Sequence, residues 1–191
     1  MWRKMVIAFA AALLSLSFQA KAAVANLIAN GGFETGDFTS WTATTNIGID
    51  SNAIDAKSGR YSAVWNDASP ATLSQTLNTV NGQGYTVDFW ASVGAGYSNE
   101  NPFFTVKFGN SVLTDIRDLS DPANWSVNYQ HFVFGVTGSG NDTLMFGVYS
   151  PESEGWLDDV SVTPVPIPGA LWLLGSGLFG LVGLRRKLAK A

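Results

Sequence analysis

The central part of this 191-residue chain is predicted to fold as an all-β sandwich, on three observations. Short runs of alternating apolar side chains recur along it, and no long stretch has apolar residues at helical spacing. Turn-forming residues separate the runs, as Asn81-Gly82-Gln83-Gly84 does before Tyr85. About 138 residues are enough to bury a core without a disulfide or a metal, which agrees with the absence of cysteine.

The alternation also predicts which side chains face the core. These are Tyr85, Val87, Phe89, Ala91 and Val93; Phe104, Val106 and Phe108; Phe132, Phe134 and Val136; Leu144, Phe146 and Val148; and Trp156, Asp158, Val160 and Val162. Antiparallel pairing of such strands gives two packed sheets, a sandwich or jelly roll, over 26–163.

The N-terminus, 1–25, has the features of a secretion signal. A short basic segment precedes the apolar run Met5–Phe18, and small residues follow it. Both Ala20-Lys21-Ala22 and Ala23-Val24-Ala25 fit a cleavage pattern, and we favour a mature chain that starts at Asn26. The alternative is a retained membrane anchor. We therefore expect a helix to precede the sandwich.

The C-terminus is predicted to be a membrane anchor in three parts. A stiff proline-rich linker occupies 164–168. The uncharged segment 169–184 would be about 24 Å long as a transmembrane helix, somewhat short of a roughly 30 Å bilayer core. A basic tail, 185–191, follows, and the positive-inside tendency puts it in the cytoplasm.

This tail resembles the PEP-CTERM sorting signal of Gram-negative bacteria. The resemblance is carried by Val165-Pro166-Ile167-Pro168, by Gly175-Ser176-Gly177 within the apolar segment, and by the basic cluster after it. It implies an exosortase as partner, transient anchoring in the inner membrane, and delivery to the cell surface or extracellular matrix. Ile167 departs from the family, which has Glu there. A plain C-terminal anchor is the alternative.

The central domain resembles galactose-binding-like jelly rolls, which are common among extracellular carbohydrate-binding modules. The landmarks are Asn30-Gly31-Gly32-Phe33-Glu34 with Gly36 and Trp41, Ser58-Gly59-Arg60-Tyr61-Ser62, Leu73-Ser74-Gln75-Thr76-Leu77, and Leu157-Asp158-Asp159-Val160-Ser161-Val162. A fold of this kind hosts many functions, so it does not identify a ligand by itself.

The same resemblance implies a structural calcium ion that joins the two ends of the domain. Its expected ligands are the Gly32 carbonyl, the Glu34 side chain, carbonyls near Lys57 and Ser58, and Asp158. Alternation turns Asp158 inward, where a bare carboxylate is costly unless it is paired or bound to a cation. The alternative is that backbone amides or Arg60 satisfy Asp158.

A candidate glycan-binding face follows from the residues that alternate with the core. Aromatic rings offer flat apolar surfaces, and polar side chains beside them orient hydroxyl groups. The candidates are Trp90, Asp88, Tyr129, His131, Tyr149 and Lys107, with Phe103 and Met145 also turned outward. The alternative is that these aromatics pack under loops.

Charge and composition exclude several functions. Between the two ends, four basic residues stand against fifteen acidic ones, a net charge of −11 that would repel nucleic acid. With no cysteine and His131 as the only histidine, the sequence supports catalysis weakly. We predict an exported, surface-sorted, non-catalytic protein that binds or organises extracellular polysaccharide. A structural or adhesive protein and a small glycan hydrolase or lyase are the alternatives.

Overall fold

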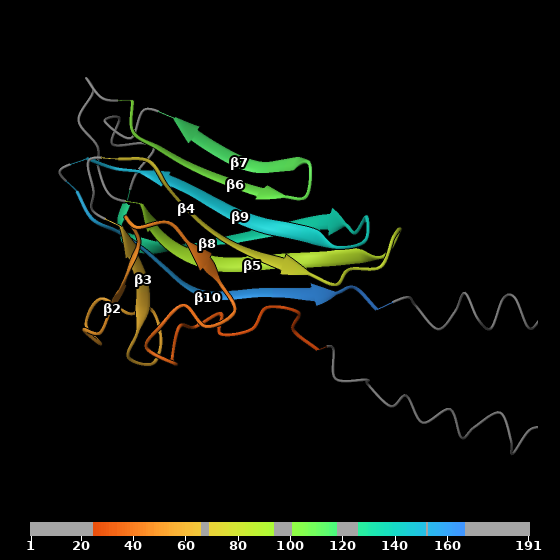
Figure 1. Ribbon diagram of the computed structural model, residues 1–191, viewed down its shortest axis with the longest axis horizontal. Helices are drawn as coiled ribbons and strands as arrows, with labels where there is room; N and C mark the ends of the chain where they lie inside the picture. The colour runs from red at the N-terminus through yellow and green to blue at the C-terminus, as the bar shows by residue number, and fades with distance from the viewer. Residues whose placement is uncertain (1–24, 66–68, 94–100, 118–125, 152, 167–191) are drawn as a thin grey trace, which may run out of the picture.

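The computed structural model describes residues 25–65, 69–93, 101–117, 126–151 and 153–166. In this part of the chain two sheets lie face to face, and there is no helix (Figure 1). The strands are β1 (Thr42–Ala43), β2 (Gly48–Asp50), β3 (Ser62–Trp65), β4 (Ala71–Leu77), β5 (Gly84–Val93), β6 (Phe103–Phe108), β7 (Ser111–Arg117), β8 (Ser126–Thr137), β9 (Asp142–Tyr149) and β10 (Gly155–Pro164).

Each sheet has five strands among the described residues. Sheet A has the order β1-β4-β9-β6-β7, and sheet B has the order β2-β3-β10-β5-β8. Every neighbouring pair is antiparallel. The predicted all-β sandwich is therefore confirmed. The signal segment up to residue 24 and the segment 169–184 lie outside the described residues, within which no helix is long and apolar enough to cross a membrane.

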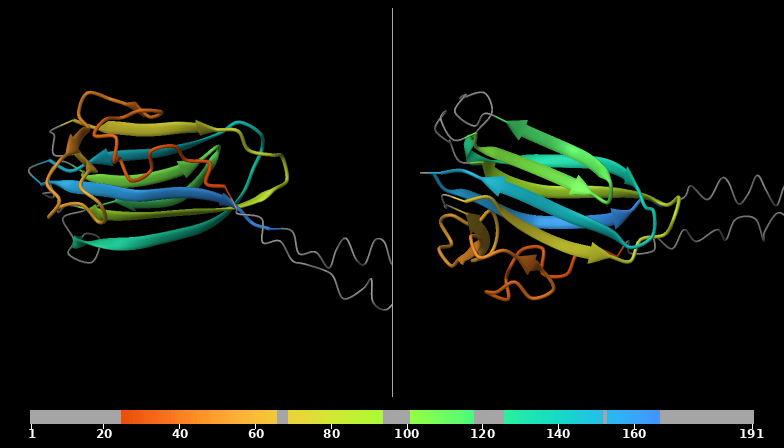
Figure 2. Two further views of the ribbon diagram at one scale, coloured as in Figure 1. Left: turned by 90° about the horizontal axis from the view of Figure 1, so that it is seen from below. Right: turned by 45° about the horizontal axis from the view of Figure 1, so that its top comes forward.

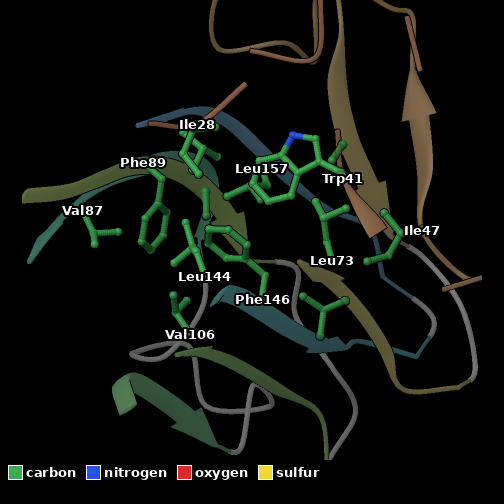
Figure 3. Packing of buried hydrophobic residues seen from close by; sticks show 14 of the residues in the cluster. Ile28, Trp41, Ile47, Leu73, Val87, Phe89, Val106, Leu144, Phe146 and Leu157 are labelled. Carbon is green, nitrogen blue, oxygen red and sulfur yellow. The ribbon is translucent and has the colours of Figure 1, made fainter. Parts of the chain in front are cut away.

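The core lies between the sheets and follows the predicted alternation. Val87 and Phe89 of sheet B and Phe104 of sheet A are each fully buried. The Phe89 ring meets the Phe146 ring edge to face across the sandwich, with centroids 5.1 Å apart (Figure 3). Phe132 is only half-buried, because β8 is the edge strand of sheet B. Burying a side chain such as Phe89 stabilises the fold by about 2–3 kcal/mol.

One predicted alternation, along β10, is wrong. The register slips between Asp158 and Ser161, and Asp159 has a φ of 51°. Because this bulge adds one residue, the strand changes face at that point. Asp158 lies opposite Trp90 on the outer face of sheet B, and the half-buried Trp156, opposite Ser92, is on the same face. Val160 and Val162 point into the core as predicted.

The two ends of the described region lie together. The Leu27 amide donates to the Val162 carbonyl at 2.8 Å, and the Val162 amide donates to Asn26 Oδ1 at 2.9 Å. Both ends therefore leave from the same end of the sandwich (Figure 2). This N-terminal segment lies along β10 of sheet B, and Ala29 also exchanges two hydrogen bonds with Gln75 of β4 in sheet A.

Candidate functional site

The six residues of the predicted glycan face lie on two opposite faces. Asp88 and Trp90 project from β5, and Tyr129 and His131 from β8, on the outer side of sheet B. Lys107 of β6 and Tyr149 of β9 project from the outer side of sheet A. The structure therefore divides the predicted face into four residues on sheet B and two on sheet A.

On sheet B, the Trp90 ring is covered by its neighbours. The His131 ring stacks on it with centroids 4.4 Å apart and planes 9° from parallel. Lys57 Nζ lies 4.3 Å from the same ring centroid. Because the imidazole fills one ring face, the ammonium lies over the other. His131 Nε2 also contacts Asp88 Oδ1 at 2.9 Å. Trp90 is thus packed in a cluster between His131 and Lys57.

A hollow of about 400 Å³ lies farther along the same face, between the strands and the loop that carries Asp55. The Tyr129 hydroxyl donates to the carbonyl of Asp55 in that loop at 2.9 Å. Trp156 Nε1 donates to Oδ2 of Asp50, the last residue of β2, at 3.0 Å. Burial raises the pKa of Tyr129, so its hydroxyl stays protonated. Trp156 was missed as an outward residue because the bulge has no signal in the apolar pattern.

On sheet A, small side chains form a row across the strands. Strand pairing brings Asp115, Thr105, Gly147 and Thr72 into line, and the Thr72 amide donates to Thr44 Oγ1 at the far end. Larger side chains form a row on each side. The first of these rows is Arg117, Phe103 and Tyr149, and the second is Val112, Lys107 and Met145. A hollow of about 330 Å³ lies over the small row. We call this hollow the sheet A trough.

The polar groups at the β7 end of the trough form one cluster. Arg117 Nε lies 2.7 Å from Asp115 Oδ1, and the Thr105 hydroxyl donates to the same oxygen. These two contacts hold the pKa of Asp115 below its usual value, and the hydrogen bond from Thr105 has the larger effect. The Arg117 guanidinium also lies 4.9 Å from the centre of the Phe103 ring. The trough therefore combines an aromatic ring with charged and hydroxyl groups.

The sequence gives one signal for this trough that alternation alone does not reveal. A glycine in the middle of a strand marks a place with no side chain to pack, where another group can approach the backbone. Gly147 is such a residue, at the centre of the small row. The partners that complete the trough, Asp115 and Thr72, come from strands whose pairing no local pattern predicts.

The expected calcium ligands gather beside the β10 bulge, under the loop before β3. Asp158 is fully buried, and its Oδ2 accepts from the Lys57 amide at 2.9 Å and the Ser58 amide at 3.0 Å. Its Oδ1 accepts from the Asp159 amide at 2.7 Å. Burial raises the pKa of Asp158 to about 6 in spite of these bonds. Lys57 and Ser58 thus contact Asp158 through N–H groups.

Glu34 and Gly32 complete this cluster. Glu34 Oε1 accepts from the Arg60 and Tyr61 amides at 2.8 and 3.0 Å. A Cβ at Gly32 would lie 3.7 Å from Asp158 Oδ1, so the carboxylate lies close to this backbone. Carboxylate and carbonyl oxygens are the ligands that calcium binds, but hydrogen bonds from backbone amides already satisfy Asp158. Among the described residues, no group of three or more acidic or histidine side chains is arranged around a metal position. Calcium therefore stays a prediction.

The comparisons with known proteins come from sequence and from structure. No known family profile matches the chain. Endo-1,4-beta-xylanase A of Thermoanaerobacterium saccharolyticum is 30% identical over an alignment of 151 residues, which covers 73% of this chain and 13% of the xylanase. The chain therefore corresponds to a small part of that enzyme's length.

Several solved structures share the fold. TmCBM61, solved in complex with beta-1,4-galactotriose, has a TM-score of 0.58 at 17% identity, with 74% of this chain and 99% of that chain covered. The CBM22-1 xylan-binding domain from Paenibacillus barcinonensis Xyn10C has a TM-score of 0.53 at 13% identity, with 76% and 97% covered. A family 16 carbohydrate-binding module has a TM-score of 0.54 at 12% identity, with 72% and 99% covered. The described domain is thus a β-sandwich similar to the jelly rolls of carbohydrate-binding modules.

Proposed function

We propose that this chain is an exported, non-catalytic protein that binds extracellular polysaccharide in the sheet A trough. The structures that share its fold are mostly carbohydrate-binding modules, and the xylanase that it resembles acts on a polysaccharide, as its name states. These likenesses support a sugar ligand as a class. They do not indicate which face of the domain would bind it.

The shape of the trough carries the proposal. Its row of small side chains runs from Asp115 on the edge strand β7 to Thr44 beside β1, across the whole of sheet A. A site that crosses a sheet from edge to edge suits an internal stretch of an extended chain. Phe103 supplies a flat apolar ring, and the threonine hydroxyls and charged groups supply hydrogen bonds to sugar hydroxyls.

The ends of the chain support export and surface sorting. We infer that residues 1–25 direct secretion, that an exosortase recognises the segment beginning at Val165, and that the protein reaches the surface of a biofilm-forming cell. Mass spectrometry of the mature C-terminus, in cells with and without the enzyme, tests this. An intact Lys190-Ala191 end in both would contradict sorting.

A binding experiment tests the polysaccharide proposal and separates the two faces. Affinity electrophoresis of the full chain against a panel of plant and bacterial polysaccharides should detect at least one ligand. Phe103→Ala should weaken that binding about tenfold, because it removes the aromatic surface of the trough. Trp90→Ala is the matched control, since Trp90 is enclosed by His131 and Lys57. Binding that Trp90→Ala abolishes and Phe103→Ala spares would contradict the site, and no binding at all would favour a structural or adhesive role.

A further inference from the structure

The charge of the sheet A trough differs from that of the rest of the domain. Of the four basic residues in the central region, Lys107 and Arg117 line the trough. Among the described carboxylates, only Asp115 faces it, and Asp115 is paired with Arg117. The other described carboxylate of sheet A, Asp142, is buried at the far end of β9 and bonds to Ser139 and Thr79. Among the described residues, the trough therefore carries a net positive charge, in a domain that is acidic as a whole.

The two cations lie on opposite sides of the small row. Arg117 is in the row that contains Phe103, and Lys107 is four residues along β6 from Phe103, which is about 13 Å of extended strand. Within the described part of the chain, no carboxylate lies at ion-pair distance from Lys107. The Arg117 side chain is 62% exposed beside Asp115. A ligand in the trough would thus meet a positive group on each side.

The negative charge elsewhere does not cancel this local field. Most described carboxylates lie on sheet B or its loops, for example Asp88 and Asp159. Packed sheets lie about 10 Å apart, and outward side chains on the two faces are farther apart still. At physiological salt, interactions between exposed charges are largely screened beyond about 8 Å. Of the described charges, those to which a ligand over sheet A responds are therefore mainly Lys107, Arg117 and Asp115.

We propose that the trough binds an acidic polysaccharide, one whose sugar units carry carboxylates, and that Lys107 and Arg117 recognise those carboxylates. This inference rests on the proposed polysaccharide-binding function and gives it a ligand class. Phe103 would pack against a sugar ring while the cations on each side pair with carboxylates that the extended chain presents along its length.

The test compares each acidic polymer with its own neutral derivative. Polygalacturonate, alginate and glucuronoxylan are titrated into the full chain, each before and after chemical reduction of its carboxyl groups. At least one acidic form should bind about tenfold more tightly than its reduced form, and rising salt should weaken that binding. Lys107→Met and Arg117→Met should each weaken acidic binding about threefold, and Lys107→Arg should restore it.

Lys57→Met is the matched control, because it removes the same charge from the opposite face. It should leave acidic binding unchanged, with melting curves of all variants recorded to verify folding. Equal affinity for acidic and reduced polymers, or equal losses in Lys57→Met and Lys107→Met, would overturn the inference and leave polysaccharide binding in place. Failure of every polymer to bind in either form would overturn the inference together with the proposed function.

Discussion

The outer faces of the two sheets differ in how their aromatic side chains are engaged. Sheet B carries Trp90, Tyr129 and Trp156, but each is held by a neighbour. The Trp90 ring lies between His131 and a lysine, the Tyr129 hydroxyl bonds to the adjacent loop, and Trp156 bonds to the end of β2. Sheet A carries fewer aromatic residues on its face, yet it leaves a row of small side chains between larger ones. Both faces are hollowed, but the hollow on sheet B lies against the loop that carries Asp55, whereas the trough on sheet A crosses the strands. The two faces therefore differ in the shape of the space beside their aromatic rings rather than in its amount.

Filling the trough should have the largest effect. Gly147 lies at its floor, where an added Cβ would make only ordinary contacts, the nearest 3.7 Å from the Phe103 ring. Gly147→Phe should therefore fold, while its ring occupies the hollow and lowers polysaccharide affinity at least about thirtyfold. Affinity electrophoresis measures the loss, and Gly147→Ala should bind nearly as well as the natural chain.

The control for this substitution lies on the other sheet. Gly135 is on β8, and an added Cβ there would meet nothing within 4 Å. Gly135→Phe adds the same side chain to the outer face of sheet B and should keep full affinity. If Gly135→Phe lost binding and Gly147→Phe kept it, the ligand would lie on sheet B and the comparison of the two faces would be reversed.

Alternation predicts the side to which a residue points, but not the sheet to which its strand belongs. Asp88 and Lys107 are both outward, as expected, and yet lie on opposite faces because β5 and β6 join different sheets. That partition depends on long-range pairing, for which the apolar pattern has no signal. The β10 bulge is a second limit, since one added residue turns Asp158 outward without changing the composition of the strand.

The carboxylate Asp158, beside the β10 bulge on the outer face of sheet B, should contribute to the stability of the fold and not to sugar binding. Asp158→Ala would leave the Lys57, Ser58 and Asp159 amides without their acceptor in a buried position. We expect a loss of about 3 kcal/mol in the free energy of unfolding, measured with urea, and unchanged polysaccharide affinity in the folded protein. A variant as stable as the natural chain would show that these bonds add nothing to the fold.

The predicted calcium ion would stabilise the same group of residues around Asp158. If an ion binds at Gly32, Glu34 and Asp158, excess calcium should raise the melting temperature above that in chelator, because it binds only the folded state. Asp158→Ala should remove this difference. Identical melting curves of the natural chain in calcium and in chelator would mean that the backbone amides alone satisfy Asp158, which is the alternative that the sequence leaves open.

The smallest expected effect is on stability in acid, and it involves Asp142, at the first position of β9 in sheet A. Burial by itself would raise the pKa of Asp142, but bonds from the Ser139 hydroxyl at 2.5 Å, the Thr79 hydroxyl at 2.5 Å and the Ser139 amide at 2.7 Å together lower it. Because the pKa is lower in the folded chain, this carboxylate stabilises the fold above its ordinary value of 3.8, and the contribution is lost as the pH falls through the folded value. Asp142→Asn should lower stability at neutral pH and flatten its decline in acid, as measured by urea midpoints across a pH series. Equal slopes in Asp142→Asn and in the natural chain would show that Asp142 has no part in acid unfolding.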